Sequence, residues 1–171
     1  MCNMGTMQRR HLFNLSVFRG LEQEQQDLLI PLISLYHIPE GTTIFKQGEA
    51  ATHLYVLESG IVEIIFKPFD GPSLSVSRLT SGCIFGWSST LGREGYTSAA
   101  KAVVDSEAYR ICGKELQALC EEHPDTGVVI LDRLASAIVE RLECTHNEIM
   151  SILNQGMDLG FNLSERGNKN D

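Results

Sequence analysis

The sequence predicts a mainly β domain with flanking helices, and three observations support this fold class. Between residues 36 and 112, apolar runs of roughly four to seven residues alternate with turns that contain glycine or proline. Before them, residues 11–36 have the composition and spacing of amphipathic helix. After Gly113 the strand-like pattern stops and helical periodicity begins.

The N-terminal helical segment carries its apolar residues between glutamines and glutamates, which favour helix. These apolar residues are Leu21, Leu28, Leu29, Leu32 and Ile33. Pro31 should end or bend the helix, because it lacks an amide hydrogen. We therefore expect one or two short helices within residues 11–36 that cover an apolar surface.

The central segment predicts an all-β sandwich or barrel. Its turns are expected at residues 39–41, 47–50, 58–60, 68–72 and 80–82. The stretch 58–60 is a hairpin signal, because Gly60 can adopt a positive φ. Residues 67–73 contain two prolines and a glycine and are expected to form an exposed hairpin tip.

Two helices are expected after Gly113. KELQALCEEHP is one short helix, and Pro124 suits the first turn of a second. Along the second helix, apolar spacings of three and four residues form a heptad seam. Its a positions are Val128, Ala135, Leu142 and Ile149, and its d positions are Leu131, Ile138, Thr145 and Ile152.

The seam predicts a homodimer through residues 125–153, and the alternative is a helix that only packs on its own β domain. A second apolar set near the start of this helix favours docking first and dimerisation further along. That set is Val129, Ile130, Leu134 and Ala137. Residues 154–171 are polar and are expected to be a flexible tail.

Composition excludes several classes of protein. The 171 residues are 43% hydrophobic and 21% charged, which suits one globular domain. The net charge of −8 disfavours non-specific DNA binding, which needs clustered lysine and arginine. No apolar run is long enough to span a membrane, and no secretory h-region is present.

The cysteines indicate a cytoplasmic protein with free thiols. They stand at positions 2, 83, 112, 120 and 144, without a C-x-x-C pair or the spacing of a zinc site. We predict no metal site, no catalytic residues and no enzymatic activity, because no nucleophile motif such as G-x-S-x-G is present.

One loop has the composition of an anion site. Residues 85–100, FGWSSTLGREGYTSAA, contain glycines at 86, 92 and 95. They also contain four hydroxyl side chains, those of Ser88, Ser89, Thr97 and Ser98. Backbone amides and hydroxyls of this kind can surround an anion, although each hydroxyl is also typical of a turn.

The order of these elements resembles the cyclic-nucleotide-binding domain family, over residues 12–153. The matching stretches are residues 38–42 and 46–49, LYVL at 54–57 with Ser59, Gly60 and Val62, Gly82 with Phe85 and Gly86, and AKA at 100–102. The resemblance implies a β-roll (a double-stranded β-helix) over about residues 36–112, a phosphate-binding cassette and a long C-terminal helix. It further implies a non-catalytic, ligand-sensing regulatory module.

The resemblance also implies which residues bind the effector. In the family, a glutamate directly after the cassette glycine binds the ribose, and an arginine about ten residues on pairs with the phosphate. Here these positions hold Trp87 and Tyr96. The candidate ligand-binding residues are Phe85, Gly86, Trp87, Ser88, Ser89, Tyr96, Thr97 and Ser98.

Three interpretations of this loop remain open. Cyclic AMP or cyclic GMP binds through amides and hydroxyls; a different small effector binds against Trp87 and Tyr96; or the two aromatics fill the interior and the domain is an interaction module. Arg93 is expected to face solvent rather than a phosphate. Haem-binding relatives make His53 or Cys83 a conceivable axial ligand.

The resemblance leads to two further expectations. We expect a single domain over residues 1–153 that signals through its C-terminal helix. The residues after Leu153 are too few for the helix-turn-helix domain of the family's transcription factors. The alternatives are a stand-alone sensor or the sensor part of a truncated DNA-binding regulator.

Overall fold

The computed structural model describes residues 11–15 and 17–140. The chain divides into two compact units, Met1–Ile138 and Val139–Asp171. Of the second unit, only residues 139 and 140 are described. The predicted limit at residue 153 and the predicted tail at 154–171 lie outside the described residues and stay predictions.

Two four-stranded antiparallel sheets make up the β part of the described chain. In order, the first sheet consists of β1 (Ile33–Ile38), β8 (Ser106–Cys112), β3 (His53–Ser59) and β6 (Ile84–Phe85). The second consists of β2 (Thr43–Phe45), β7 (Ala99–Ala102), β4 (Val62–Phe66) and β5 (Leu74–Leu79). With helices before and after the strands, this confirms the predicted fold class.

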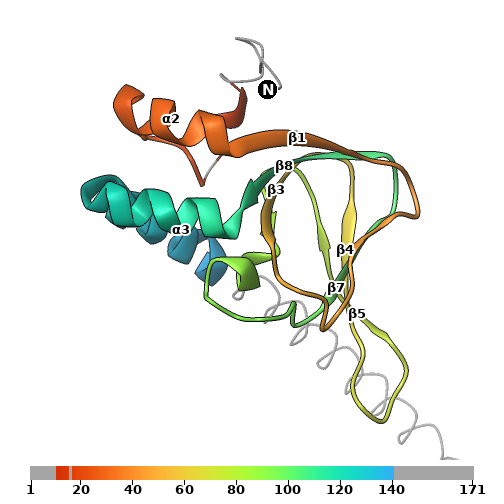
Figure 1. The fold of residues 1–171 in the computed structure, drawn as a ribbon. Helices are drawn as coiled ribbons and strands as arrows, with labels where there is room; N and C mark the ends of the chain where they lie inside the picture. The colour runs from red at the N-terminus through yellow and green to blue at the C-terminus, as the bar shows by residue number, and fades with distance from the viewer. Residues whose placement is uncertain (1–10, 16, 141–171) are drawn as a thin grey trace, which may run out of the picture. The chain divides into compact units, whose positions relative to one another are not determined.

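The first sheet is buried on both faces, because the second sheet covers one and helices cover the other (Figure 1). Successive strand residues point to opposite faces. Along β3, Leu54 and Val56 therefore join the core beneath the helices, whereas Tyr55 and Leu57 join the core between the sheets. We call these the outer core and the inner core.

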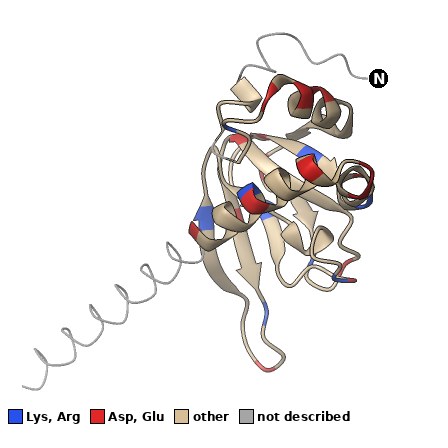
Figure 2. Ribbon diagram, turned by 90° about the vertical axis from the view of Figure 1, so that its left-hand side faces the viewer, with Lys and Arg blue, Asp and Glu red and all other residues tan. Residues whose placement is uncertain are grey.

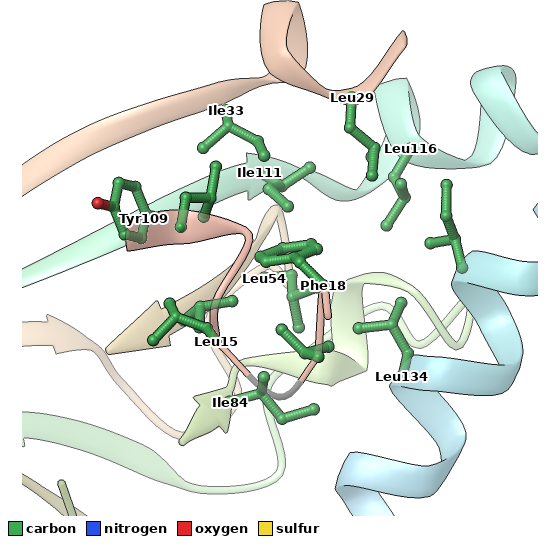
Figure 3. Close-up of a cluster of buried hydrophobic side chains, with 14 of the residues drawn as sticks. Leu15, Phe18, Leu29, Ile33, Leu54, Ile84, Tyr109, Ile111, Leu116 and Leu134 are labelled. Carbon is green, nitrogen blue, oxygen red and sulfur yellow. The ribbon is translucent and has the colours of Figure 1, made fainter. Parts of the chain in front are cut away.

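The outer core joins the N-terminal segment, the first sheet and the C-terminal helices (Figure 3). Its buried members are Leu12, Leu15, Val17, Phe18, Leu21, Leu29, Ile33, Leu54, Val56, Ile84, Tyr109, Ile111, Leu116, Leu119, Ile130 and Leu134. The buried members of the inner core are Ile38, Phe45, Tyr55, Leu57, Val62, Ile64, Leu79, Phe85, Tyr96, Ala100, Ala102 and Ala108.

The N-terminal helical segment is shorter than predicted. Helix α2 spans Gln23–Leu29 and begins where the Glu22 amide donates to Gln25 Oε1 at 3.0 Å. A 3₁₀ turn, η1 (Ile30–Leu32), follows around Pro31. The expectation of helix up to residue 36 is wrong from Ile33 onward, because Ile33–Ile38 pairs with β8 as β1. Pairing with a neighbouring strand overrides local propensity there.

The predicted turn at residues 58–60 is present, but it connects β3 of the first sheet to β4 of the second, so the prediction of a hairpin there is wrong. The predicted hairpin tip at 67–73 is confirmed, because β4 and β5 pair with each other. Gly60 adopts φ 93° in the turn between β3 and β4. Residues 67–73 connect β4 to β5 and reach beyond the rest of the sheet (lower right in Figure 1). Phe69 at this tip is fully exposed.

Both predicted C-terminal helices are present. Helix α3 spans Gly113–Glu122, and a second helix covers residues 124–140. The two helices approach closely, since a Cβ atom on Gly127 would lie 2.9 Å from the Cα of Cys120. No helix in the described part of the chain is long and apolar enough to cross a membrane.

The second helix has two different apolar faces. Ile130 and Leu134 are buried in the outer core, and Val129 and Ala137 pack against it. Val128 and Leu131, from the heptad seam, are 68% and 48% exposed. Ala135 is also exposed, whereas Ile138 is half-buried against the outer core. The seam residues Leu142, Thr145, Ile149 and Ile152 lie outside the described residues.

Acidic residues are prominent on the helical side. Figure 2 shows Asp and Glu along α2 and on the neighbouring helices, whereas the Lys and Arg segments of the described chain are scattered. This distribution agrees with the net charge of −8.

The outer core yields a stability prediction. Leu116→Ala in α3 should lower the free energy of unfolding by about 2–5 kcal/mol, because the side chain is 2% exposed and its removal leaves a cavity. Leu91→Ala is the control, since Leu91 is 59% exposed and should change stability by less than about 0.5–1 kcal/mol. Urea unfolding measures both, and equal losses would contradict the assignment of the outer core.

Candidate functional site

The glycine that opens the cassette-like loop lies against the wall of the roll. Gly86 follows β6 and adopts φ 75°. A Cβ atom there would lie 2.8 Å from the carbonyl oxygen of His53 and 3.0 Å from Tyr55 Cδ2. Only glycine combines this backbone conformation with so close an approach. The loop then turns into the short 3₁₀ helix η2 (Trp87–Ser89).

Tyr96, which the resemblance places where the family has its phosphate-binding arginine, is turned into the roll. It is 4% exposed, and its ring stacks on Phe45 with the centroids 3.8 Å apart. Its hydroxyl donates to the carbonyl of His53 at 2.9 Å. The same hydroxyl accepts from the amides of His53 at 3.0 Å and Thr52 at 3.3 Å. Tyr96 thus fastens the loop to the start of β3.

Four aromatic rings meet inside the roll at this point. Phe45 lies 5.8 Å from Tyr55 and 6.1 Å from Phe85, and Tyr55 stacks on Phe85 at 5.0 Å. Burial, together with the neighbouring Tyr96, raises the pKa of Tyr55 above its usual range. The Tyr55 hydroxyl is therefore neutral at physiological pH.

The side chain of Trp87 lies on the other side of the first sheet from Tyr96. It is partly buried against the outer core, under the helices. Trp87 and Tyr96 therefore do not form two walls of one site. They bind the loop to two different cores.

The buried serines of η2 serve the loop itself. Ser88 and Ser89 are 4% and 7% exposed, and Ser89 Oγ donates to the Gly86 carbonyl at 3.0 Å. Ser89 also touches the beginning of α3, because a Cβ atom on Gly113 would lie 2.5 Å from the Ser89 carbonyl oxygen. The loop and α3 are therefore in direct contact.

The remaining candidate residues lie closer to solvent. Phe85 is buried in the inner core, whereas Thr97 is exposed and Ser98 is half-buried. Arg93 is exposed, as expected. The Tyr96 amide donates to Glu49 O at 2.9 Å, and the Gly48 amide donates to Tyr96 O at 2.8 Å, which closes this end of the loop.

At positions 87 and 96 the loop offers a ligand neutral aromatic side chains instead of charged ones. Neither position 87 nor position 96 supplies a charge. The described residues contain no cluster of three or more metal-ligating side chains. Three residues outside the predicted ligand-binding set form the wall around Tyr96, namely Phe45, His53 and Tyr55. Strand alternation could have put Tyr55 on the same face as Leu57, but not next to the loop.

A family comparison agrees with this geometry. The family model described as "Cyclic nucleotide-binding domain" matches residues 35–123, which include both sheets from β1 onward and α3. The chain belongs to the cyclic nucleotide-binding domain family. The predicted resemblance is confirmed.

The sequence relatives are bacterial proteins named as a cyclic AMP receptor or as transcriptional regulators. A cyclic AMP receptor protein of Thermus thermophilus is 29% identical over 126 residues, which are 74% of this chain and 56% of that protein. The cAMP-activated global transcriptional regulator CRP of Salmonella typhimurium is 30% identical over 67% of this chain and 53% of its own length. The chain therefore spans little more than half the length of these relatives.

Solved structures show the same fold. A Geobacter metallireducens protein described as cyclic nucleotide-binding has a TM-score of 0.70 and 28% identity, over 78% of this chain and 97% of that chain. The Thermus thermophilus catabolite activator protein has a TM-score of 0.64 and 27% identity, over 80% of this chain and 62% of its own.

The role of the Tyr96 hydroxyl can be tested by removing it alone. Tyr96→Phe should lower the free energy of unfolding by about 1–3 kcal/mol, because two half-buried amides and a carbonyl lose their partner while the ring stack stays. Urea unfolding followed by circular dichroism measures the loss.

Tyr36→Phe is the matched control for this variant. Tyr36 is half-buried, and no hydrogen bond of its hydroxyl is found among the described residues. Its change should stay within about 0.5 kcal/mol. If both variants lost the same stability, the hydroxyl of Tyr96 would have no special role.

Proposed function

We propose that this chain is the ligand-sensing domain of a regulator, without catalytic activity of its own. A small effector binds inside the roll behind the loop 85–98, and the loop passes the change to α3 and to the helix at 124–140. Several of the sequence relatives are named as transcriptional regulators, which supports the regulatory role.

One observation carries this proposal: the loop touches both cores. Gly86 lies against Tyr55 in the roll, whereas the next residue, Trp87, packs under the helices. Ser89 lies against Gly113 at the start of α3. A ligand that moves the loop by even a small distance must therefore shift the packing of the helical layer, because protein interiors are close-packed.

The effector is held differently from the nucleotide in a family member with both charged side chains. Losing a charge-assisted hydrogen bond removes about 1.5–3 kcal/mol, which is about one to two powers of ten in affinity. Here the glutamate and the arginine are both replaced. We therefore infer that cyclic AMP and cyclic GMP bind weakly and that another small effector is the physiological one.

A second candidate function is supported by the packing of Tyr96. Its ring and hydroxyl occupy the interior position with a stack and three hydrogen bonds. If this arrangement is permanent, the domain is an interaction module, and its helix at 124–140 is the surface that binds another chain.

Both candidates include a homodimer through the heptad seam. Val128 and Leu131 are apolar and exposed, although Ile130 and Leu134 of the same helix are buried. An apolar stripe that the domain itself does not cover is typical of a surface that binds another chain.

A role in a DNA-binding regulator is suggested only by the names of the relatives. Those named as transcriptional regulators match this chain over 53–59% of their length. The residues that this chain shares with them suit the sensing part of such a regulator. The loop that moves on effector binding would then act on whatever the C-terminal helix contacts.

The single tryptophan of the chain provides a test of sensing. Trp87 lies at the junction of loop and helices, so its fluorescence should change saturably when an effector binds. We expect cyclic AMP, cyclic GMP and cyclic di-GMP to give no saturable change at micromolar concentration, whereas a small-molecule screen identifies a compound that does.

Calorimetry on the same protein checks the binding itself. Trp87→Phe is the control for the optical signal, since it should remove the fluorescence change but retain the heat of binding. Micromolar binding of cyclic AMP would contradict the inference that cyclic AMP binds weakly and that another effector is the physiological one. A screen without any binder would favour the interaction module.

The dimer is tested on the exposed face of the helix. Leu131→Asp should convert a dimer to a monomer, because it places charges within the seam, and it should leave the outer core intact because Leu131 is 48% exposed. Light scattering measures the mass, and the circular dichroism spectrum checks the fold.

Ser136→Asp introduces the same charge on an exposed position of the same helix, away from the seam. This control should remain a dimer. A monomeric parent protein, or dissociation by both substitutions, would rule out the seam as the interface.

A further inference from the structure

Five polar and aromatic side chains gather on the inner face of the first sheet, at the end near the start of β3. Arg110 pairs with Ser34 on one side and with Tyr55 on the other. Tyr36 and His53 lie two residues away on the same strands and therefore share this face. We call Ser34, Tyr36, His53, Tyr55 and Arg110 the Arg110 cluster.

The guanidinium group is held in place by neutral neighbours. Arg110 Nε donates to Ser34 Oγ at 3.0 Å, and its central carbon lies 5.1 Å from the centre of the Tyr36 ring. The ring of Tyr55 is 6.4 Å from that of Tyr36 and 6.2 Å from that of His53. The Tyr36 ring therefore lies against a half-buried positive charge, and the rings of Tyr55 and His53 continue the cluster from there.

No carboxylate of the described residues forms an ion pair with Arg110. This is unexpected in a chain with 22 acidic and 14 basic residues other than histidine. Arg78, by contrast, is more exposed and lies 3.7 Å from Glu63. A partly buried charge loses hydration and normally has a partner of opposite charge.

The charge of Arg110 affects the pKa of His53. Burial and then Arg110 lower the pKa of His53, while Glu115 in the first turn of α3 raises it. The imidazole is therefore mostly neutral at physiological pH. The cluster has one strong cationic donor group, with neutral hydroxyl and imidazole groups beside it.

We propose that the Arg110 cluster binds the oxyanion group of a small aromatic effector. The planar guanidinium donates paired hydrogen bonds to a phosphate or a carboxylate, and the rings of Tyr36 and Tyr55 provide apolar contact for the rest of the molecule. This inference rests on the proposed sensing function and assigns its anionic contact to β8 instead of the loop.

The cluster is joined to the loop through Tyr55. Tyr55 stacks on Phe85 at 5.0 Å and lies against Gly86, the residue before Trp87. An anion that draws in Arg110 or shifts Tyr55 therefore acts directly on the loop. Arg93, by contrast, is exposed and lies four residues beyond the end of η2.

The test uses the full chain with three probes: phenyl phosphate, benzoate and inorganic phosphate. Proton NMR follows the pKa of His53, and Trp87 fluorescence follows the loop. We expect phenyl phosphate or benzoate to bind saturably and to raise the pKa of His53, because a bound anion offsets the charge of Arg110. The better of the two probes identifies the anion as phosphate or carboxylate.

Inorganic phosphate separates the anion from the ring. It should raise the pKa of His53 but bind more weakly than phenyl phosphate, because it makes no contact with the tyrosine rings. Equal affinity for the two would overturn the aromatic part of the proposal.

Arg110→Gln should weaken binding about tenfold or more, and Arg110→Lys should restore part of it because lysine keeps the charge but not the planar fork. Arg93→Gln is the matched control and should bind as the parent protein does. Circular dichroism confirms that each variant is folded. Unchanged binding in folded Arg110→Gln, or no response of His53 to any probe, would overturn the proposal.

The two readouts distinguish this inference from the proposed function. A raised pKa of His53 without any change in Trp87 fluorescence would support the anion site but not sensing through the loop. An effector that changes Trp87 fluorescence equally in the parent protein and in Arg110→Gln would support sensing but not this site.

Discussion

The burial of β3 on both faces is the constraint on which the rest of the structure depends. Leu54 and Val56 point to the helices, and Tyr55 and Leu57 point to the second sheet. One strand therefore contributes to two cores, and any loop fastened to it can contact both. The loop 85–98 is such a loop, because Tyr96 binds the start of β3 from inside and Trp87 packs outside.

With Trp87 and Tyr96 where the resemblance places the family's glutamate and arginine, the roll would recognise its ligand differently. A buried arginine needs an anion beside it, whereas a buried tyrosine finds its partners in the backbone. Tyr96 does this with the amides and the carbonyl at Thr52 and His53. The Tyr96 hydroxyl thus has its hydrogen-bond partners within the chain. The half-buried Arg110, with only neutral partners among the described residues, is the exception and for that reason points to a ligand.

Much of the fold follows from sequence, because its signals are local. The turn at Gly60, the exposed tip at 67–73 and the helix starting near Pro124 each depend on one or two residues. The first strand could not be predicted from its own residues, because Ile33–Ile38 becomes a strand by pairing with Ser106–Cys112, which is distant in the sequence. The sequence located the loop of the site, but not the directions of its side chains. Trp87 points to the outer core and Tyr96 to the inner core, and this depends on how the two sheets and the helices pack together.

The two faces of the helix at 124–140 would carry a change in the loop to the second chain of the proposed dimer. Ile130 and Leu134 are fixed in the outer core that Trp87 also contacts, and Val128 and Leu131 lie on the exposed side. Because a helix moves as a rigid element, a displacement of its buried face displaces the exposed face by a similar amount. In the proposed dimer, the loop would therefore act on the interface without contacting it. The coupling requires only that Trp87 and the helix share one closely packed core.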